Sequence, residues 1–151
     1  MQQLLSFLTV DPLQENWDAS LQAAVSSLKG ALRTFKMSIS FQGDHTTPSR
    51  VQIQLQDAVG NDLAEQYYLR VRVVNNNGYL VATHATMSAY IGTLVETITT
   101  GKDLIFQSDA SGLIEVTCTD ATAETFQVCI GAPDLCPPFA NFNNSQTVVH
   151  T

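Results

Sequence analysis

The sequence is poor in charged residues, and basic ones are the scarcer kind. Seven Lys and Arg stand against 14 Asp and Glu among 151 residues, which gives a formal net charge of −7. Direct binding to nucleic acid depends on Lys and Arg that neutralise phosphates, so this balance predicts no nucleic-acid partner. The hydrophobic fraction of 44% nevertheless indicates a chain that folds around a core, and its length predicts a single domain.

Long apolar runs are also lacking. The early run "LLSFLTV" (residues 4–10) is much shorter than the ~20 apolar residues of a membrane-spanning helix. No basic segment precedes it, and no small-residue cleavage site follows before Asp11 and Pro12, as a signal peptide would require. We therefore expect neither a signal peptide nor a membrane partner.

Cysteines are few and odd in number, because the chain has three. This count does not fit a closed disulfide framework and favours folding in a reducing compartment. Strand alternation predicts Cys118 on an inner face and Cys129 on an outer face, which prevents a bridge between them. A small loop closed by Cys129 and Cys136 remains as an alternative to three free thiols.

Recognisable catalytic motifs are missing too. The sequence contains no glycine-rich phosphate loop, no Gly-x-Ser-x-Gly elbow and no Cys-His signature. His45, His84 and His150 lie far apart, without the paired spacing of a metal site. We expect no catalytic residue, no metal and no cofactor. A hydrolase with an unrecognised site is the enzymatic alternative, and it would need a pocket lined by perturbed His or carboxylate groups.

A helical pattern occupies residues 11–29. Asp11 is placed to cap the helix with Pro12 at its first position, and Gly30 is placed to end it. We expect the apolar stripe of this helix to pack on the β domain of its own chain or on a neighbouring subunit. Its apolar residues recur at spacings of three and four, at Leu13, Trp17, Leu21, Ala24, Val25 and Leu28.

From Phe35 onward the period changes to two, as in strands with one buried face. In "FKMSISF" the alternation points Phe35, Met37, Ile39 and Phe41 inward. About eight or nine short strands separated by turn signals predict an antiparallel sandwich or barrel, with an immunoglobulin-like β-sandwich as the leading architecture. The run at 79–98 is expected to hold two strands with a break near 88–92.

Two similar segments, "QDAVGND" (56–62) and "QSDASGL" (107–113), raise the question of calcium binding. Neither has the regular acidic spacing or the distal Glu of a calcium loop. Asp at the first position and Gly at the fourth position of a type I turn explain both, with the glycine at positive φ. We predict two tight chain reversals, at Asp57–Gly60 and at Asp109–Gly112.

The end of the chain changes character again. "GAPDLCPPFANFNN" is rich in Pro and Asn, which predicts an extended arm, and "SQTVVHT" has the composition of an edge strand in this molecule or in a neighbour. The predicted organisation is an N-terminal arm and amphipathic helix at 1–33, an immunoglobulin-like sandwich at 34–132, and a C-terminal arm with a terminal strand at 133–151.

One surface patch is a candidate for recognition. Alternation in the strand at 64–74 sends Tyr68, Arg70 and Arg72 to one outward face. Such a face could contact a host glycan or protein. The alternatives are a solvated sheet face or cover by another part of the same chain.

Several short motifs occur in an order that resembles a known module. "VQIQLQDAVGNDLAEQYYLRVRVV" followed by "GTLVETITTGKDLIFQSDASGLIEVTCT" is similar to an immunoglobulin-like module of structural proteins from tailed bacteriophages. The "GAP" segment and the terminal "TVVHT" also resemble the close of such chains. The resemblance covers about residues 50–151 and does not extend to the helical first third.

This resemblance implies a non-enzymatic structural virion protein, most directly a capsid decoration or cement protein that folds in the host cytoplasm before assembly. A tail, neck or fibre component, or an adhesion module that binds a host glycan or protein, is the alternative. Its partners would be other virion proteins and copies of itself. The residues expected to carry subunit contacts are Leu13, Trp17, Leu21, Leu28, Pro137, Pro138, Phe139, Phe142, Val148 and Val149.

Overall fold

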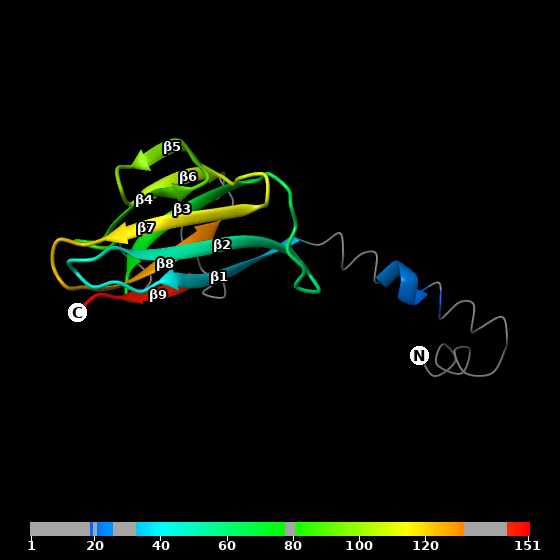
Figure 1. Cartoon of the computed structure of the whole chain (residues 1–151), viewed down its shortest axis with the longest axis horizontal. Helices are drawn as coiled ribbons and strands as arrows, with labels where there is room; N and C mark the ends of the chain where they lie inside the picture. Colours follow the sequence, from blue (N-terminus) through cyan, green and yellow to red (C-terminus); the bar gives the residue numbers. More distant parts are fainter. Residues whose placement is uncertain (1–18, 20, 26–32, 78–80, 132–144) are drawn as a thin grey trace. The chain divides into compact units, whose positions relative to one another are not determined.

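The computed structural model describes residue 19 and residues 21–25, 33–77, 81–131 and 145–151 (Figure 1). The chain divides into two compact units, Met1–Thr34 with Asp57–Asn61, and Phe35–Gln56 with Asp62–Thr151. The described residues form nine strands: β1 (Arg33–Phe41), β2 (Ser49–Asp57), β3 (Tyr68–Asn75), β4 (Thr86–Ile91), β5 (Thr93–Thr99), β6 (Asp103–Gln107), β7 (Leu113–Thr119), β8 (Thr125–Gly131) and β9 (Ser145–Val149).

The strands build two antiparallel sheets. Sheet 1 has the order β1-β2-β7-β4, and sheet 2 has the order β5-β6-β3-β8-β9. Inward side chains of both sheets join one hydrophobic core, which gives a sandwich-like arrangement. The largest of its fully buried side chains are those of Phe106, Phe126, Ile53 and Ile114. The predicted mainly β class is therefore confirmed.

Strand alternation accounts for the positions of the two described cysteines. Cys118 on β7 is fully buried in the shared core, as predicted. Cys129 on β8 pairs in register with Arg72 on β3, so it faces away from the core cluster although it is 5% exposed. Both are free thiols, while Cys136 lies outside the described residues. Burial raises the pKa of the Cys118 thiol to about 12 and that of Cys129 to about 11.

The inward alternation predicted for β1 holds only at its beginning. Phe35 and Met37 pack against the core, with the Phe35 ring 5.2 Å from that of Tyr67. Phe41 is 47% exposed, and its ring lies beside Arg50. β1 is an edge strand with one neighbour in sheet 1, so its last residue is less constrained by packing. The expectation that Phe41 points inward is wrong.

The two similar Asp-Ala-x-Gly segments are tight reversals, as predicted. Asp57 accepts bonds from the backbone N–H groups of Val59 and Asn61, both at 2.9 Å, and Gly60 has a φ of 94°. At the second reversal, the N–H groups of Ser111 and Leu113 donate to Asp109, and Gly112 has a φ of 73°. These bonds occupy the carboxylates within their own turns.

Both reversals stand where the chain passes from one sheet to the other. The first follows β2 of sheet 1 and precedes β3 of sheet 2, while the second joins β6 of sheet 2 to β7 of sheet 1. Antiparallel pairing of β2 with β7 places the end of one beside the start of the other, and Leu55 N–H donates to Gly112 O at 3.0 Å. The two segments therefore connect the layers rather than close hairpins within one sheet.

The predicted break in the run at 79–98 is a single residue. β4 ends at Ile91 in sheet 1 and β5 begins at Thr93 in sheet 2, so Gly92 alone carries the chain across. Its φ of 90° lies in the left-handed region, and a Cβ there would stand 2.7 Å from Gln107 O. Glycine is required at this position for both reasons.

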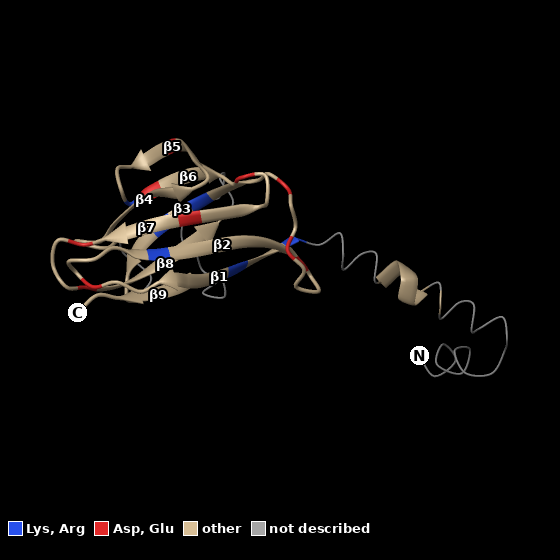
Figure 2. Cartoon of the chain, in the orientation of Figure 1, with Lys and Arg blue, Asp and Glu red and all other residues tan. Residues whose placement is uncertain are grey.

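Most of the predicted helix lies outside the described residues. Ala19 and residues 21–25 are helical, and Leu21 and Val25 are exposed. No helix among the described residues is long and apolar enough to span a membrane. Figure 2 shows acidic residues mainly in the loops at strand ends, with few charges along the strands.

Candidate functional site

The described subunit-contact candidates fall in different environments. Leu21 is 56% exposed and Val149 is 46% exposed. Val148 is fully buried, because β9 pairs with β8 in its own sheet and adds this side chain to the core. The remaining candidates, which lie outside the described residues, are Leu13, Trp17, Leu28, Pro137, Pro138, Phe139 and Phe142.

The recognition face predicted on β3 is largely used within the chain. Arg70 Nε and Nη2 each lie 2.7 Å from the carboxylate of Asp103 on β6, and Arg72 Nη2 lies 2.9 Å from the same carboxylate. Asp103 and Arg70 are buried, whereas Tyr68 is 53% exposed. Tyr68 is therefore the exposed member of the predicted group.

The ion-paired cluster shifts the acid–base behaviour of Asp103. Burial by itself raises the pKa of this carboxyl, but the hydrogen bonds and positive charges of Arg70 and Arg72 outweigh it and lower the pKa below 3.8. Asp103 is therefore a carboxylate that forms ion pairs with two guanidinium groups on the sheet. This arrangement stabilises the pairing of β3 with β6 and offers no unpaired acid for catalysis.

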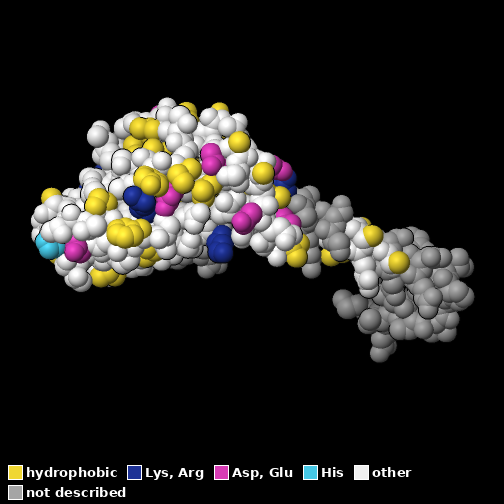
Figure 3. Space-filling model, viewed as in Figure 1, with side chains coloured by type: hydrophobic (Ala, Val, Ile, Leu, Met, Phe, Trp, Pro, Cys, Tyr) yellow, Lys and Arg dark blue, Asp and Glu magenta, His cyan; other side chains and the backbone are white. Residues whose placement is uncertain are grey.

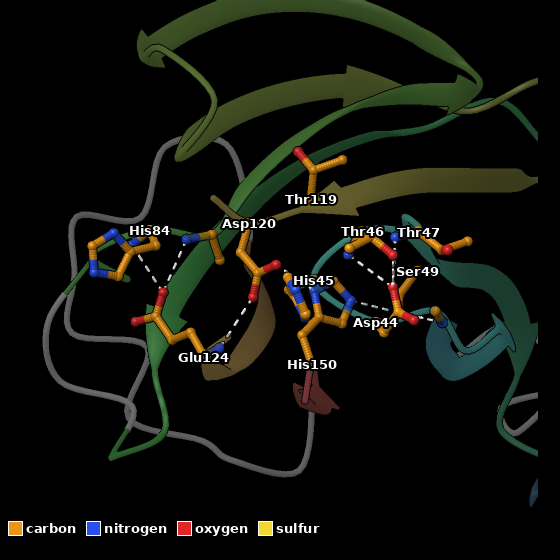
Figure 4. A network of polar contacts seen from close by, with 12 residues as sticks. Asp44, His45, Thr46, Thr47, Ser49, His84, Thr119, Asp120, Glu124 and His150 are labelled. Atoms are coloured by element: carbon orange, nitrogen blue, oxygen red, sulfur yellow. Dashed lines mark hydrogen bonds and ion pairs between the residues drawn. The ribbon is translucent and has the colours of Figure 1, made fainter. Parts of the chain in front are cut away.

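Among the described residues, no group of three or more His, Cys, Asp or Glu could hold a metal ion. The three histidines instead contact different partners within one network of polar contacts (Figure 4). His45 Nδ1 lies 2.8 Å from Thr151 O, and the backbone N–H of His84 donates to the Glu124 carboxylate at 2.8 Å. His150 is the histidine that lies between other reactive side chains.

Ser49, His150 and Asp120 form a chain of contacts with the geometry of a Ser-His-Asp triad. Ser49 Oγ and His150 Nε2 are 2.7 Å apart, and His150 Nδ1 and Asp120 Oδ1 are 2.9 Å apart. The last two atoms are close enough for an ion pair, although neither has a regular hydrogen bond in the described structure. Sequence motifs do not reveal this group, because Ser49 is the first residue of β2, Asp120 directly follows β7 and His150 directly follows β9.

The surroundings of this triad close it to substrate. Ser49 is 0% exposed and His150 is 2% exposed, with the Phe126 ring packed edge-on at 5.3 Å from the imidazole. Gly43 N–H donates to Ser49 Oγ at 2.8 Å, so this donor is bonded to the hydroxyl oxygen. A nucleophilic serine needs an approachable carbonyl and donors aimed at the developing oxyanion. Ser49 has no exposed surface, so such a carbonyl cannot reach it in the described structure.

The same contacts hold the end of the chain to two loops. Gln42 Nε2 donates to Val149 O at 2.7 Å, and His150 N–H donates to Glu124 O at 3.2 Å. Together with the contacts of His45 and His150, these bonds connect residues 149–151 to the β1–β2 loop and the β7–β8 loop (Figure 4). We call the group Ser49, Asp120 and His150 the buried triad, and its evident action is to fasten β9.

The fold and this site define a mainly β chain with two sheets and a closed polar cluster. The chain matches no protein-family model, no curated protein and no solved structure.

Proposed function

We propose that the chain is a non-enzymatic structural protein that acts by assembly, in keeping with its resemblance to decoration or tail proteins of tailed bacteriophages. Within that proposal, the fold is an immunoglobulin-like sandwich. β1, β2, β7 and β4 take the places of strands A, B, E and D, and sheet 2 takes the places of C″, C′, C, F and G. In an immunoglobulin variable domain the chain passes through C′, C″ and D in that order. Here β4, β5 and β6 take the places D, C″ and C′, which is the reverse order.

The observation that carries the proposal is the exposure of β5. This strand lies at the edge of sheet 2, and all seven of its residues are exposed. Leu94, Val95 and Ile98 are 44%, 51% and 43% exposed, and Glu96 is the one charged residue of the strand. Sheet edges in monomers are usually protected by charges, proline or short length, because an open edge pairs with other chains. Although its pairing with β6 has two register irregularities, a seven-residue edge with one charge and three exposed apolar side chains favours assembly by strand addition.

Assembly through β5 is tested by adding a charge to the edge. Val95→Lys in the full chain should lower the weight-average mass of the protein at a given concentration, measured by analytical ultracentrifugation. Val59→Lys is the matched control, because Val59 is 68% exposed in the reversal after β2. A wild-type chain that sediments as a monomer at every accessible concentration would exclude self-assembly through this edge.

A virion role is tested separately on particles that contain the protein. Its copy number there should match the symmetry of a shell for a decoration protein, or of a ring for a neck or tail protein. A chain that is absent from purified particles would overturn the virion proposal and leave the sedimentation result unaffected.

A further inference from the structure

The outer face of sheet 1 carries two exposed aromatic side chains around one arginine. Arg50 on β2 has its guanidinium carbon 3.8 Å from the ring centre of Tyr90 on β4 and 6.0 Å from that of Phe41 on β1. Tyr90 is 52% exposed and Phe41 is 47% exposed. The cation–π contacts hold the three planar groups in place while leaving ring surface open to solvent.

Two glutamines continue this face along β2. Gln52 and Gln54 follow Arg50 on the outward side, because their register partners on β7 are Glu115 and Leu113 while the intervening Ile53 is in the core. At about 3.4 Å per residue, Gln54 is roughly 14 Å from Arg50 along the strand. Gln54 Nε2 donates to Leu55 O and Ser111 O, both at 3.1 Å, which fixes the orientation of its amide.

The glutamines open into a polar hollow. Its lining is Lys36, Ser38, Gln52, Gln54 and Asp62. One ammonium, one hydroxyl, one carboxylate and two amides thus provide hydrogen-bond donors and acceptors within a short distance. Figure 3 shows the same face, where apolar side chains stand on both sides of a basic and an acidic group.

The chemistry of this face selects one class of ligand. Phosphate-rich ligands are disfavoured because Asp62 and Glu115 accompany the cations Lys36 and Arg50. A protein partner would be expected to cover a more apolar central patch than two separated rings. Sugar hydroxyls both donate and accept hydrogen bonds, and the C–H face of a sugar ring packs on the negative face of an aromatic ring.

We propose that the outer face of sheet 1 binds an oligosaccharide that runs along β2, with one sugar ring on Tyr90 and Phe41 and the next ones over Gln52, Gln54 and the hollow. This glycan strip lies on a different sheet from the Tyr68 face and from the β5 edge. It requires no self-assembly, so either proposal can fail without the other.

The probes are maltohexaose, cellohexaose and chitohexaose, titrated one at a time into the isotope-labelled full chain and followed by NMR. At least one should bind, with shift changes confined to β1, β2, β4 and β7. Tyr90→Ala and Gln54→Ala should each weaken that binding about tenfold or more, while Tyr90→Phe, which keeps the ring, should retain it.

Tyr68→Ala distinguishes this strip from the recognition face predicted on β3, because Tyr68 is 53% exposed but lies in sheet 2. The affinity of this variant for the hexasaccharide should equal that of the wild type. The proposal is overturned if none of the three hexasaccharides binds the wild type. It is equally overturned if Tyr68→Ala weakens binding as much as Tyr90→Ala, or if Tyr90→Ala binds normally while its spectrum shows the native fold.

Discussion

At the scale of single residues, Asp103 is a buried carboxylate with two arginine partners. Its carboxylate is 1% exposed and contacts both Arg70 and Arg72. Removal of one partner from a buried ion pair leaves uncompensated charge, which costs more than the pair contributes. Because both arginines pair with Asp103, their guanidinium groups lie against the sheet and are used within the chain.

Asp103→Asn should lower the free energy of unfolding by about 3 kcal/mol at neutral pH, measured by urea denaturation. Asp62→Asn is the control, because Asp62 is exposed and accepts one hydrogen bond from Gln56. Its effect should stay below about 1 kcal/mol. Equal effects of the two substitutions would show that the cluster around Asp103 does not stabilise the fold.

The contribution of Asp103 depends on pH with a defined sign. Its pKa in the folded chain is below the ordinary 3.8, so the unfolded state takes up a proton first as the solution is acidified. The stabilisation by Asp103 is complete at pH values above the pKa of this carboxyl in the unfolded state. It is lost as the pH falls through the lower pKa of the folded state. The stability difference between wild type and Asp103→Asn should therefore narrow below about pH 4.

At the scale of elements, the two reversals share a sequence pattern but not an environment. A Cβ on Gly112 would lie 2.1 Å from Leu63 O, whereas a Cβ on Gly60 would meet nothing within 4 Å. Both glycines have positive φ, so both substitutions carry backbone strain. Only the Gly112 reversal also carries a collision with the backbone of another segment.

Gly60→Ala should therefore cost about 1–2 kcal/mol of unfolding free energy, which is the strain of a left-handed residue. Gly112→Ala should cost clearly more, because the backbone at Leu63 must move. Urea denaturation of the two variants beside the wild type measures the difference. Equal losses would mean that the contact between the second reversal and Leu63 is absent in solution.

Strand positions could be predicted from the sequence because alternation and turn residues are local signals. β1 contains the predicted alternating run from Phe35 to Phe41, and the break at Gly92 lies within the predicted interval. Which strands pair with each other could not be predicted from these local signals. Whether β9 joined this chain or a neighbour depended on Val148 fitting a core assembled from distant strands.

The buried triad shows the same limit at the level of the site. Ser49, Asp120 and His150 are ordinary residues in the sequence, and only the crossing of β2, β7 and β9 brings them within hydrogen-bond distance. Likewise, Arg50 and Tyr90 are separated by a strand of the sheet, since β7 lies between β2 and β4. Both groups depend on strand order, which periodicity does not determine.

At the scale of the whole molecule, the buried triad connects the end of sheet 2 with sheet 1. Ser49→Ala should remove the partner of His150 Nε2 and lower the unfolding free energy by about 1–3 kcal/mol. Hydrogen exchange should quicken in β9 more than in β3. Ser88→Ala, at an exposed serine on β4, should change neither quantity. Identical behaviour of the two variants would remove the proposed fastening role.

The two sides of the sandwich are closed by different kinds of bond. On one side, the covalent step at Gly92 joins β4 to β5, and on the other, side chains join β9 to the loops of sheet 1. Under tension applied between Arg33 and Val149, load first reaches β1 and β9, which are edge strands with one neighbour each. Stretching should therefore release these two strands before the central ones, so that rupture proceeds in steps and the Gly92 side separates last.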